Sequence, residues 1–133
     1  MLIVAYASLT GNVRRFIASL DGFESIEISS DTVIKSPFVL ITYTTGKGQT
    51  PREVVHFLER GDNSKNLKGV IGSGNRNWGR NFCKGAKSVS SFYNVPLIHE
   101  FEMSGSLDDI SIVTDKLKEL KGRCKIDKMD TTE

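Results

Sequence analysis

Short apolar runs recur along the chain and predict the strands of a β-sheet. Four of them are rich in β-branched and aromatic residues: 2–7, 38–43, 69–72 and 96–101. The first three do not alternate polar with apolar side chains, which is typical of strands buried on both faces of a parallel sheet. Residues 25–30 do alternate. We therefore expect a fifth strand there, nearer an edge of the sheet.

Apolar residues at helical spacing predict helices between these strands. Three stripes follow steps of three and four residues: Val13, Phe16, Ile17 and Leu20; Phe82, Ala86, Val89 and Tyr93; Ile110, Val113, Leu117 and Leu120. Another helix is expected after the 38–43 strand, where Thr50 and Glu53 form a capping box around Pro51. The last stripe begins at Ser106-Leu107-Asp108-Asp109, with acids where a helix N-terminus favours them.

The order of these elements predicts an α/β fold. It reads β-α-β-β-α-β-α-β-α, with a short or missing helix between the second and third strands. Such alternation favours an open, parallel, doubly wound sheet with helices on both faces. Residues 121–133 are polar and aperiodic, so we expect them to form a frayed tail outside the folded domain of residues 1–120.

Composition limits the class of protein. A chain of 133 residues, 38% hydrophobic and 26% charged, suits one ordinary globular domain. No apolar run approaches the ~20 residues of a membrane span, and no signal peptide is visible, so we expect a cytoplasmic protein without a membrane partner. Cys83 and Cys124 show no metal-ligand spacing, which predicts reduced thiols and no metal. The net charge of +2 is too small to suggest nucleic-acid binding, and His56 and His99 are expected to be solvated or structural.

The search for a site begins at the carboxyl ends of the strands, where open α/β sheets bind ligands. Four loops follow strands there: 8–12, 44–50, 73–79 and 102–106. The first, Ser-Leu-Thr-Gly-Asn, opens a helix and offers hydroxyls, an amide and backbone N–H groups to an anion. It lacks the dinucleotide and Walker glycine motifs and contains no lysine or arginine, so it suits a terminal phosphate held by neutral donors. The alternative is that Thr10 and Asn12 only cap the helix.

Two further loops are rich in glycine. Around Lys47, two glycines allow close backbone approach to a flat ligand, although this loop taken alone reads as an ordinary strand-to-helix turn. The segment 72–79 contains Trp78, the chain's only tryptophan, which offers a face for stacking or folds back into the core. A phosphate cradle, an aromatic face and backbone donors together suit a mononucleotide with a flat ring system. FMN meets that description, and spacing alone does not separate it from other nucleotides.

Four segments together resemble the NrdI family, the flavodoxin-like accessory flavoproteins of class Ib ribonucleotide reductase: 8–16, 41–51, 69–79 and 94–105. The resemblance runs from Leu2 to about Leu120, and its most specific element is Ser-Gly-Asn-Arg-Asn-Trp-Gly at 73–79. It implies a flavodoxin-like three-layer sandwich, with a five-stranded parallel sheet in the order 2-1-3-4-5, and one noncovalently bound FMN.

The resemblance also assigns site residues by position. It implies that the phosphate is held by Ser8, Leu9, Thr10, Gly11, Asn12 and Val13. It implies that one side of the isoalloxazine is bordered by Thr44, Thr45, Gly46, Lys47 and Gly48, and the other by Ser73, Gly74, Asn75, Asn77, Trp78 and Gly79. Lys47 departs from the family, which often has an aromatic residue or a glycine there. No catalytic or metal-binding residue is assigned.

The activity implied by the resemblance has no organic substrate. Reduced FMN reacts with dioxygen and delivers an oxidant, understood as superoxide, to the di-manganese site of the small reductase subunit, where a tyrosyl radical forms. The expected partners of this monomer are that subunit, dioxygen and an unidentified flavin or thiol reductase. The alternatives are a general electron-transfer flavodoxin serving another acceptor and a cofactor-free α/β binding module.

Charge is unevenly distributed along the chain. Residues 72–87 include four basic residues and no acidic one: Arg76, Arg80, Lys84 and Lys87. Lys47 and Arg52 flank the neighbouring loop. Positive charge beside a flavin favours its reduced, anionic state. We therefore expect easier full reduction than in an acidic flavodoxin, or a basic surface that docks an acidic partner.

Overall fold

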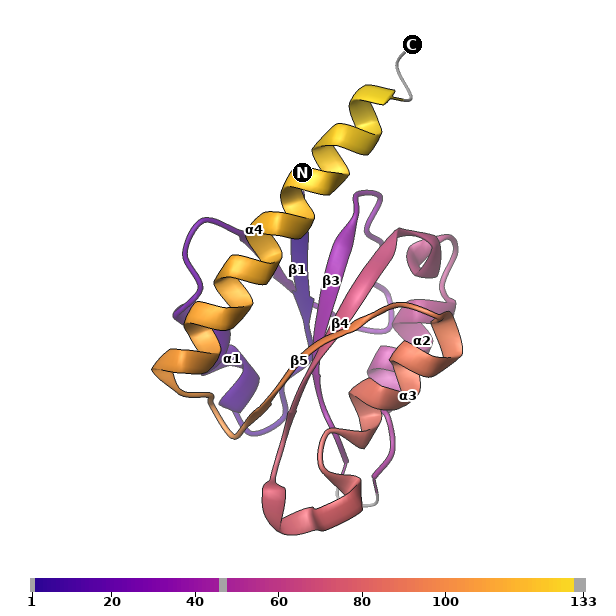
Figure 1. Ribbon diagram of the computed structural model, residues 1–133. Helices are drawn as coiled ribbons and strands as arrows, with labels where there is room; N and C mark the ends of the chain where they lie inside the picture. The colour runs from indigo at the N-terminus through magenta and orange to yellow at the C-terminus, as the bar shows by residue number, and fades with distance from the viewer. Residues whose placement is uncertain (1, 46–47, 131–133) are drawn as a thin grey trace.

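Five parallel strands form one sheet in the computed structural model, which describes residues 2–45 and 48–130 (Figure 1). The strands are β1 (Ile3–Tyr6), β2 (Glu24–Glu27), β3 (Phe38–Tyr43), β4 (Leu67–Gly74) and β5 (Leu97–Glu102). Their order is β2-β1-β3-β4-β5, and every neighbouring pair runs parallel. The flavodoxin-like strand order is therefore confirmed, and the alternating segment 25–30 overlaps the edge strand β2.

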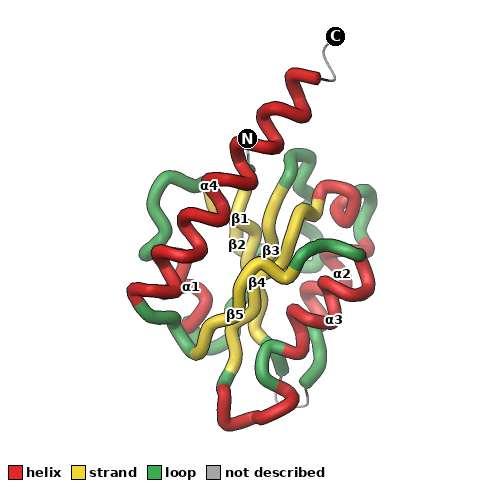
Figure 2. The backbone as a smooth tube through the Cα atoms, in the orientation of Figure 1, coloured by secondary structure: helices red, strands yellow, loops and turns green. Residues whose placement is uncertain are grey.

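Helices cover both faces of this sheet (Figures 1 and 2). They are α1 (Asn12–Ala18), α2 (Arg52–Glu59), α3 (Lys84–Tyr93) and α4 (Leu107–Asp130), with short 3₁₀ segments η1 (Asn63–Asn66) and η2 (Arg76–Asn81). Helices α1 and α4 lie on one face, and α2 and α3 on the other. Residues 28–37, between β2 and β3, contain no helix, as the sequence pattern predicts.

The core is split into two halves by the sheet, and successive residues of a strand enter opposite halves. On β3, Phe38 and Leu40 pack with α2 and α3, whereas Val39 and Ile41 pack with α1 and α4. All four side chains are fully buried. A strand covered on both faces needs apolar residues at every position, which is why this run shows no alternation.

The start of α2 differs from the sequence-based prediction. A capping box at Thr50 and Glu53 is wrong, because the N-cap is Pro51 and no side chain caps the helix. The Thr50 hydroxyl instead donates to the carbonyl of Gly85 (3.0 Å), and the Glu53 carboxylate accepts from the Tyr43 hydroxyl (2.6 Å). Burial, followed by the bond to Glu53, raises the pKa of Tyr43 above its usual range. The two side chains that the local sequence assigns to the cap therefore form hydrogen bonds with other parts of the fold instead.

The start of α4 follows its predicted pattern and is tied to the sheet. The Ser106 hydroxyl accepts from the Asp109 N–H (3.1 Å), and the Asp109 carboxylate accepts from the Ser106 N–H (2.8 Å). His99 on β5 bonds the other oxygen of Asp109 at 2.8 Å, so this histidine is structural, as expected. Burial raises the pKa of Asp109, but the bonds from His99 and Ser106 outweigh it and leave that pKa below its ordinary value.

The far end of α4 corrects another expectation. Residues 121–130 are helical, so a frayed tail from residue 121 is wrong for this segment (Figure 1). The helix continues where it leaves the sheet, and the exposed Glu119–Arg123 ion pair there has the four-residue spacing that favours a helix. Among the described residues, none of the helices combines the length and apolar character needed to cross a membrane.

Candidate functional site

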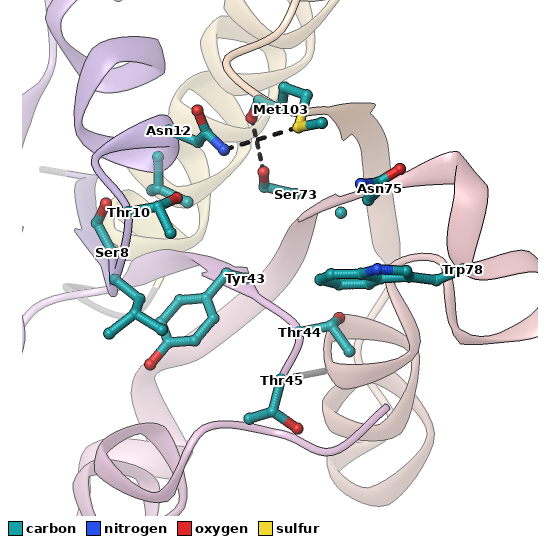
Figure 3. A pocket seen from close by; sticks show the side chains of 13 residues that line it. Ser8, Thr10, Asn12, Tyr43, Thr44, Thr45, Ser73, Asn75, Trp78 and Met103 are labelled. Carbon is teal, nitrogen blue, oxygen red and sulfur yellow. Dashed lines mark hydrogen bonds between the residues drawn. The ribbon is translucent and has the colours of Figure 1, made fainter. Parts of the chain in front are cut away.

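A pocket of about 370 Å³ lies at the carboxyl ends of β1, β3 and β4 (Figure 3). Its volume is within the range of roughly 300–1,000 Å³ that is usual for small-molecule sites. The chain order reverses here, because the strands that follow β1 along the chain lie on its two opposite sides. The lining residues are Ser8, Leu9, Thr10, Asn12, Val13, Tyr43, Thr44, Thr45, Ser73, Gly74, Asn75, Trp78 and Met103.

All four loops named from the sequence contribute to this pocket, but not every residue assigned by resemblance lines it. Gly11 and Gly48 belong to the loops without lining the pocket, and Asn77 and Gly79 are exposed on η2. Gly46 and Lys47 lie outside the described residues. Contact of the assigned residues with a bound flavin stays a prediction.

The loop between β1 and α1 has a backbone conformation that depends on Gly11. Its φ is +89°, in the left-handed region that side chains disfavour, and its carbonyl accepts the Arg15 N–H (2.9 Å) in the first turn of α1. A Cβ atom at Gly11 would lie 3.3 Å from Nη1 of Arg15. The guanidinium of Arg15 thus folds back over a loop that contains no basic residue of its own. Sequence inspection of residues 8–12 missed this charge because Arg15 lies one helical turn later.

Trp78 is part of the wall of the pocket and not of the core. Its side chain is 39% exposed, and in Figure 3 the indole extends into the pocket toward the β3 end at Thr44. The Asn75 side chain caps η2 by accepting the Asn77 N–H (2.9 Å), and the Trp78 N–H bonds the Asn75 carbonyl (3.0 Å). This short turn holds the tryptophan backbone in place, so the segment 73–79 is not simply a flexible loop.

Hydroxyl groups form the floor of the pocket, and two of them are engaged with neighbouring elements. The buried Thr44 hydroxyl accepts the Gly85 N–H of α3 (2.9 Å), and the buried Ser73 hydroxyl donates to the Met103 carbonyl (2.7 Å). A Cβ atom at Gly74 would lie only 2.8 Å from the backbone nitrogen of Cys83. Glycine is needed there because the end of β4 packs directly against the chain that enters α3.

Cys83 is packed beneath the floor of the pocket, and its thiol is unreactive. It is fully buried, and burial, followed by the nearby Glu100 carboxylate, raises the pKa of its thiol to about 12. The thiolate is the reactive form of cysteine, so a thiol with this pKa stays protonated near neutral pH. Its role is packing, in agreement with the sequence-based interpretation.

Tyr43 and Met103 also line the pocket, and the sequence-based assignment missed both. Tyr43 is the last residue of β3, directly before the loop that was assigned, so its position was accessible from the strand boundary. Met103 follows β5 in the turn 103–105, with φ +56° and its N–H bonded to the Gly74 carbonyl (2.9 Å). Residues 102–106 were expected at the correct edge, but nothing in their side chains indicated that Met103 would line the pocket.

The basic stretch 72–87 is partly neutralised by β5. Arg76 lies 3.9 Å from Glu102, which also accepts the Arg76 backbone N–H (3.1 Å), and Lys87 lies 3.4 Å from Glu100. These acids are more than ten residues away in sequence and adjacent in the fold. The positive bias near the pocket is therefore smaller than the sequence suggests, because two of its charges have an opposite partner within salt-bridge distance.

Comparison with known proteins gives the family. The family described as "NrdI Flavodoxin like" matches residues 4–115. The chain belongs to this NrdI family. "Protein NrdI" of Bacillus licheniformis is 40% identical over 129 residues, which cover 96% of this chain and 97% of that protein. "Protein NrdI" of Macrococcus caseolyticus is 38% identical over 119 residues, covering 90% and 91%.

Solved structures agree on the fold of this NrdI-family chain. A short-chain flavodoxin associated with a non-canonical PDU bacterial microcompartment superposes with a TM-score of 0.70 at 21% identity, covering 93% of this chain and 99% of that one. A cysteine-to-serine mutant of flavodoxin from Pseudomonas aeruginosa superposes with a TM-score of 0.58 at 17% identity, covering 94% and 99%. At these identities the likeness concerns the fold alone.

FMN is the cofactor of this flavodoxin-like family, and the pocket fits it. The β1–α1 loop offers backbone N–H groups, hydroxyls and the Asn12 amide to a phosphate. Trp78 offers an aromatic face. Glycines at 48 and 74 allow close packing against Asn81 and Cys83, because a Cβ atom at either position would lie within 3 Å of these residues. The donor set suits an anion at one end of the pocket and a flat apolar ring at the other.

Replacing Trp78 with alanine is expected to preserve the fold and to weaken FMN binding by roughly 2- to 13-fold, since an aromatic contact of this kind contributes about 0.5–1.5 kcal/mol. Titration of the apoprotein with FMN and a thermal unfolding curve measure both effects. Phe92→Ala is the matched control, because Phe92 is an exposed aromatic residue on α3 that does not line this pocket. An FMN affinity equal to that of the wild type would contradict a role for Trp78 in the site.

Proposed function

We propose that this chain is the FMN-dependent redox accessory protein of a class Ib ribonucleotide reductase. Membership of the NrdI family across most of the chain carries the proposal. When bound in its reduced state, FMN supplies the electron that converts dioxygen to superoxide. The oxidant then serves the di-manganese site of the small reductase subunit, where the tyrosyl radical forms. A flavin or thiol reductase of the cytoplasm supplies the electrons.

The residues of this chain bind and orient the cofactor and leave its rim accessible. Residues 8–13 hold the phosphate, while Thr44, Thr45 and Trp78 border the ring. Three large apolar side chains at the pocket remain exposed: Leu9 by 74%, Met103 by 45% and Trp78 by 39%. An accessible apolar rim supports both access of dioxygen and contact with a partner subunit.

The test is assembly of the radical from purified components. The FMN-loaded protein is reduced without oxygen, mixed with the small subunit and Mn²⁺, and then exposed to dioxygen. We expect a tyrosyl-radical signal by electron paramagnetic resonance, and we expect superoxide dismutase to lower its yield. The control omits reduction of the FMN-loaded protein.

Two results would contradict the proposal. One is a radical yield that does not depend on the reduced protein. The other is efficient electron transfer to an unrelated acceptor without radical formation, which would favour a general electron-transfer flavodoxin.

A further inference from the structure

The side-chain amide of Asn12 is held by donors from two different elements. Its Oδ1 accepts the Ser104 hydroxyl (2.9 Å), which comes from the turn after β5, and Nη1 of Arg15 (3.3 Å), which comes from α1. On its other side, Nδ2 lies 3.9 Å from Sδ of Met103 (Figure 3). Asn12 itself lines the pocket.

These neighbours determine which way the amide points. An arginine guanidinium has donors and no acceptor, so the amide atom that faces Arg15 is the oxygen. A thioether sulfur is only an acceptor, so the atom that faces Met103 is the NH₂ group. Both contacts give the same orientation. The group that Asn12 directs toward Met103 at the pocket is therefore a hydrogen-bond donor.

The turn that supplies Ser104 is fixed independently of the β1–α1 loop. The Met103 N–H donates to the Gly74 carbonyl (2.9 Å), and the Met103 carbonyl accepts the Ser73 hydroxyl (2.7 Å). The Gly105 N–H closes the turn on the Glu102 carbonyl (2.9 Å). Through its bond to Asn12, Ser104 thus connects this turn, and with it β4 and β5, to the start of α1.

We infer that Ser104 and Arg15 are positioning residues that present the Asn12 NH₂ group to the phosphate of FMN, and that they thereby set the preference of this pocket for FMN over riboflavin. A carboxamide donor suits anionic phosphate oxygens and gains nothing from a riboflavin that lacks them. The inference rests on the placement of the phosphate at residues 8–13 proposed above, and it is independent of any role with ribonucleotide reductase.

The experiment measures dissociation constants of FMN and riboflavin by titrating the apoprotein and its variants, with a thermal unfolding curve for each. Ser104→Ala is expected to weaken FMN binding roughly 3- to 10-fold, as for the loss of one hydrogen bond, and to leave riboflavin binding unchanged. Ser104→Thr keeps the hydroxyl and restores most of the FMN affinity. Ser111→Ala is the matched control, because Ser111 is exposed on α4 away from the pocket.

Two further variants separate orientation from charge. Asn12→Asp keeps the shape of the side chain and replaces the NH₂ group with a carboxylate oxygen, so FMN binding falls more than about 10-fold while riboflavin binding is retained. Arg15→Ala lowers the preference for FMN. Arg14→Ala is its control, because it removes the same charge from a side chain that bonds Glu27 and not the Asn12 amide. We expect this control to leave the preference for FMN over riboflavin unchanged.

The outcomes distinguish failure of this inference from failure of the phosphate placement. A wild-type protein that binds both flavins equally would contradict the placement and with it the inference. A wild type that prefers FMN, with Ser104→Ala unchanged or equally weakened for both flavins, would overturn the inference alone. If Ser104→Ala does not fold, Asn12→Asp decides, because an equal loss for both flavins in that variant would overturn the inference in the same way.

Discussion

Replacing Gly11 with valine is expected to lower FMN affinity about 100-fold or more. Gly11 has φ +89°, and a β-branched residue at that angle is a genuine outlier, so the loop must change its backbone course. That change misdirects the N–H groups of the loop 8–12, which is proposed to hold the phosphate. Loss of two hydrogen bonds to a charged group, at about 1.5–3 kcal/mol each, corresponds to about 100-fold or more in the dissociation constant.

Gly22 provides the matched control for this substitution. Its φ of +86° is nearly the same, nothing lies within 4 Å of a Cβ atom there, and it is remote from the pocket lining. Gly22→Val therefore introduces similar backbone strain without touching the site. We expect both variants to lose comparable stability in thermal unfolding, and only Gly11→Val to lose FMN. Equal FMN affinity in the two variants would refute the assignment of the phosphate to this loop.

Replacing Gly105 with alanine is expected to destabilise the fold by about 2–5 kcal/mol. A Cβ atom there would lie 2.6 Å from Cδ1 of Phe16, whose ring stacks on Phe101 with centroids 4.0 Å apart. Both rings are fully buried, so neither can move without disturbing the core. Overpacking of this kind costs about 1–3 kcal/mol, and the left-handed φ of +79° adds about 1–2 kcal/mol.

Urea unfolding measures this loss, and Gly22→Ala isolates its backbone component. At Gly22 the angle is similar and the surrounding space is empty, so we expect only about 1–2 kcal/mol there. Equal destabilisation in the two variants would mean that contact with the Phe16 ring contributes nothing, and that the turn 103–105 is less tightly packed than its distances indicate.

The fold was largely predictable because burial on both faces leaves a local signature. Each of the four main strands appears in the sequence as an apolar run, and the helices appear as stripes. The edge strand β2 was recognisable from its alternation. The boundary of α4 was not, since apolar periodicity reports packing against the sheet, whereas the backbone hydrogen bonds of a helix can continue beyond it.

The pocket was predictable in part, for a related reason. Parallel strands bring their carboxyl ends to one edge, so the loops after β1, β3 and β4 could be grouped without knowledge of their side-chain positions. Tyr43 could have been assigned from the boundary of β3, whereas Met103 and the two donors to the Asn12 amide, Ser104 and Arg15, could not. Their roles depend on which side chains of separate loops come within hydrogen-bond distance, and sequence separation carries no information on that distance.

By itself, the sequence determined the class of fold, the strand order through resemblance, the loops that form the pocket and the residue types suited to a phosphate and a flat ring. These features follow from local patterns of burial and backbone freedom. Only the tertiary structure decided that Glu53 bonds Tyr43 instead of capping α2, that Glu100 and Glu102 offset two nearby cations, and that the Ser104 hydroxyl bonds the Asn12 amide. Each of these interactions joins segments brought together by folding, and electrostatic and hydrogen-bond energies depend on distances in space.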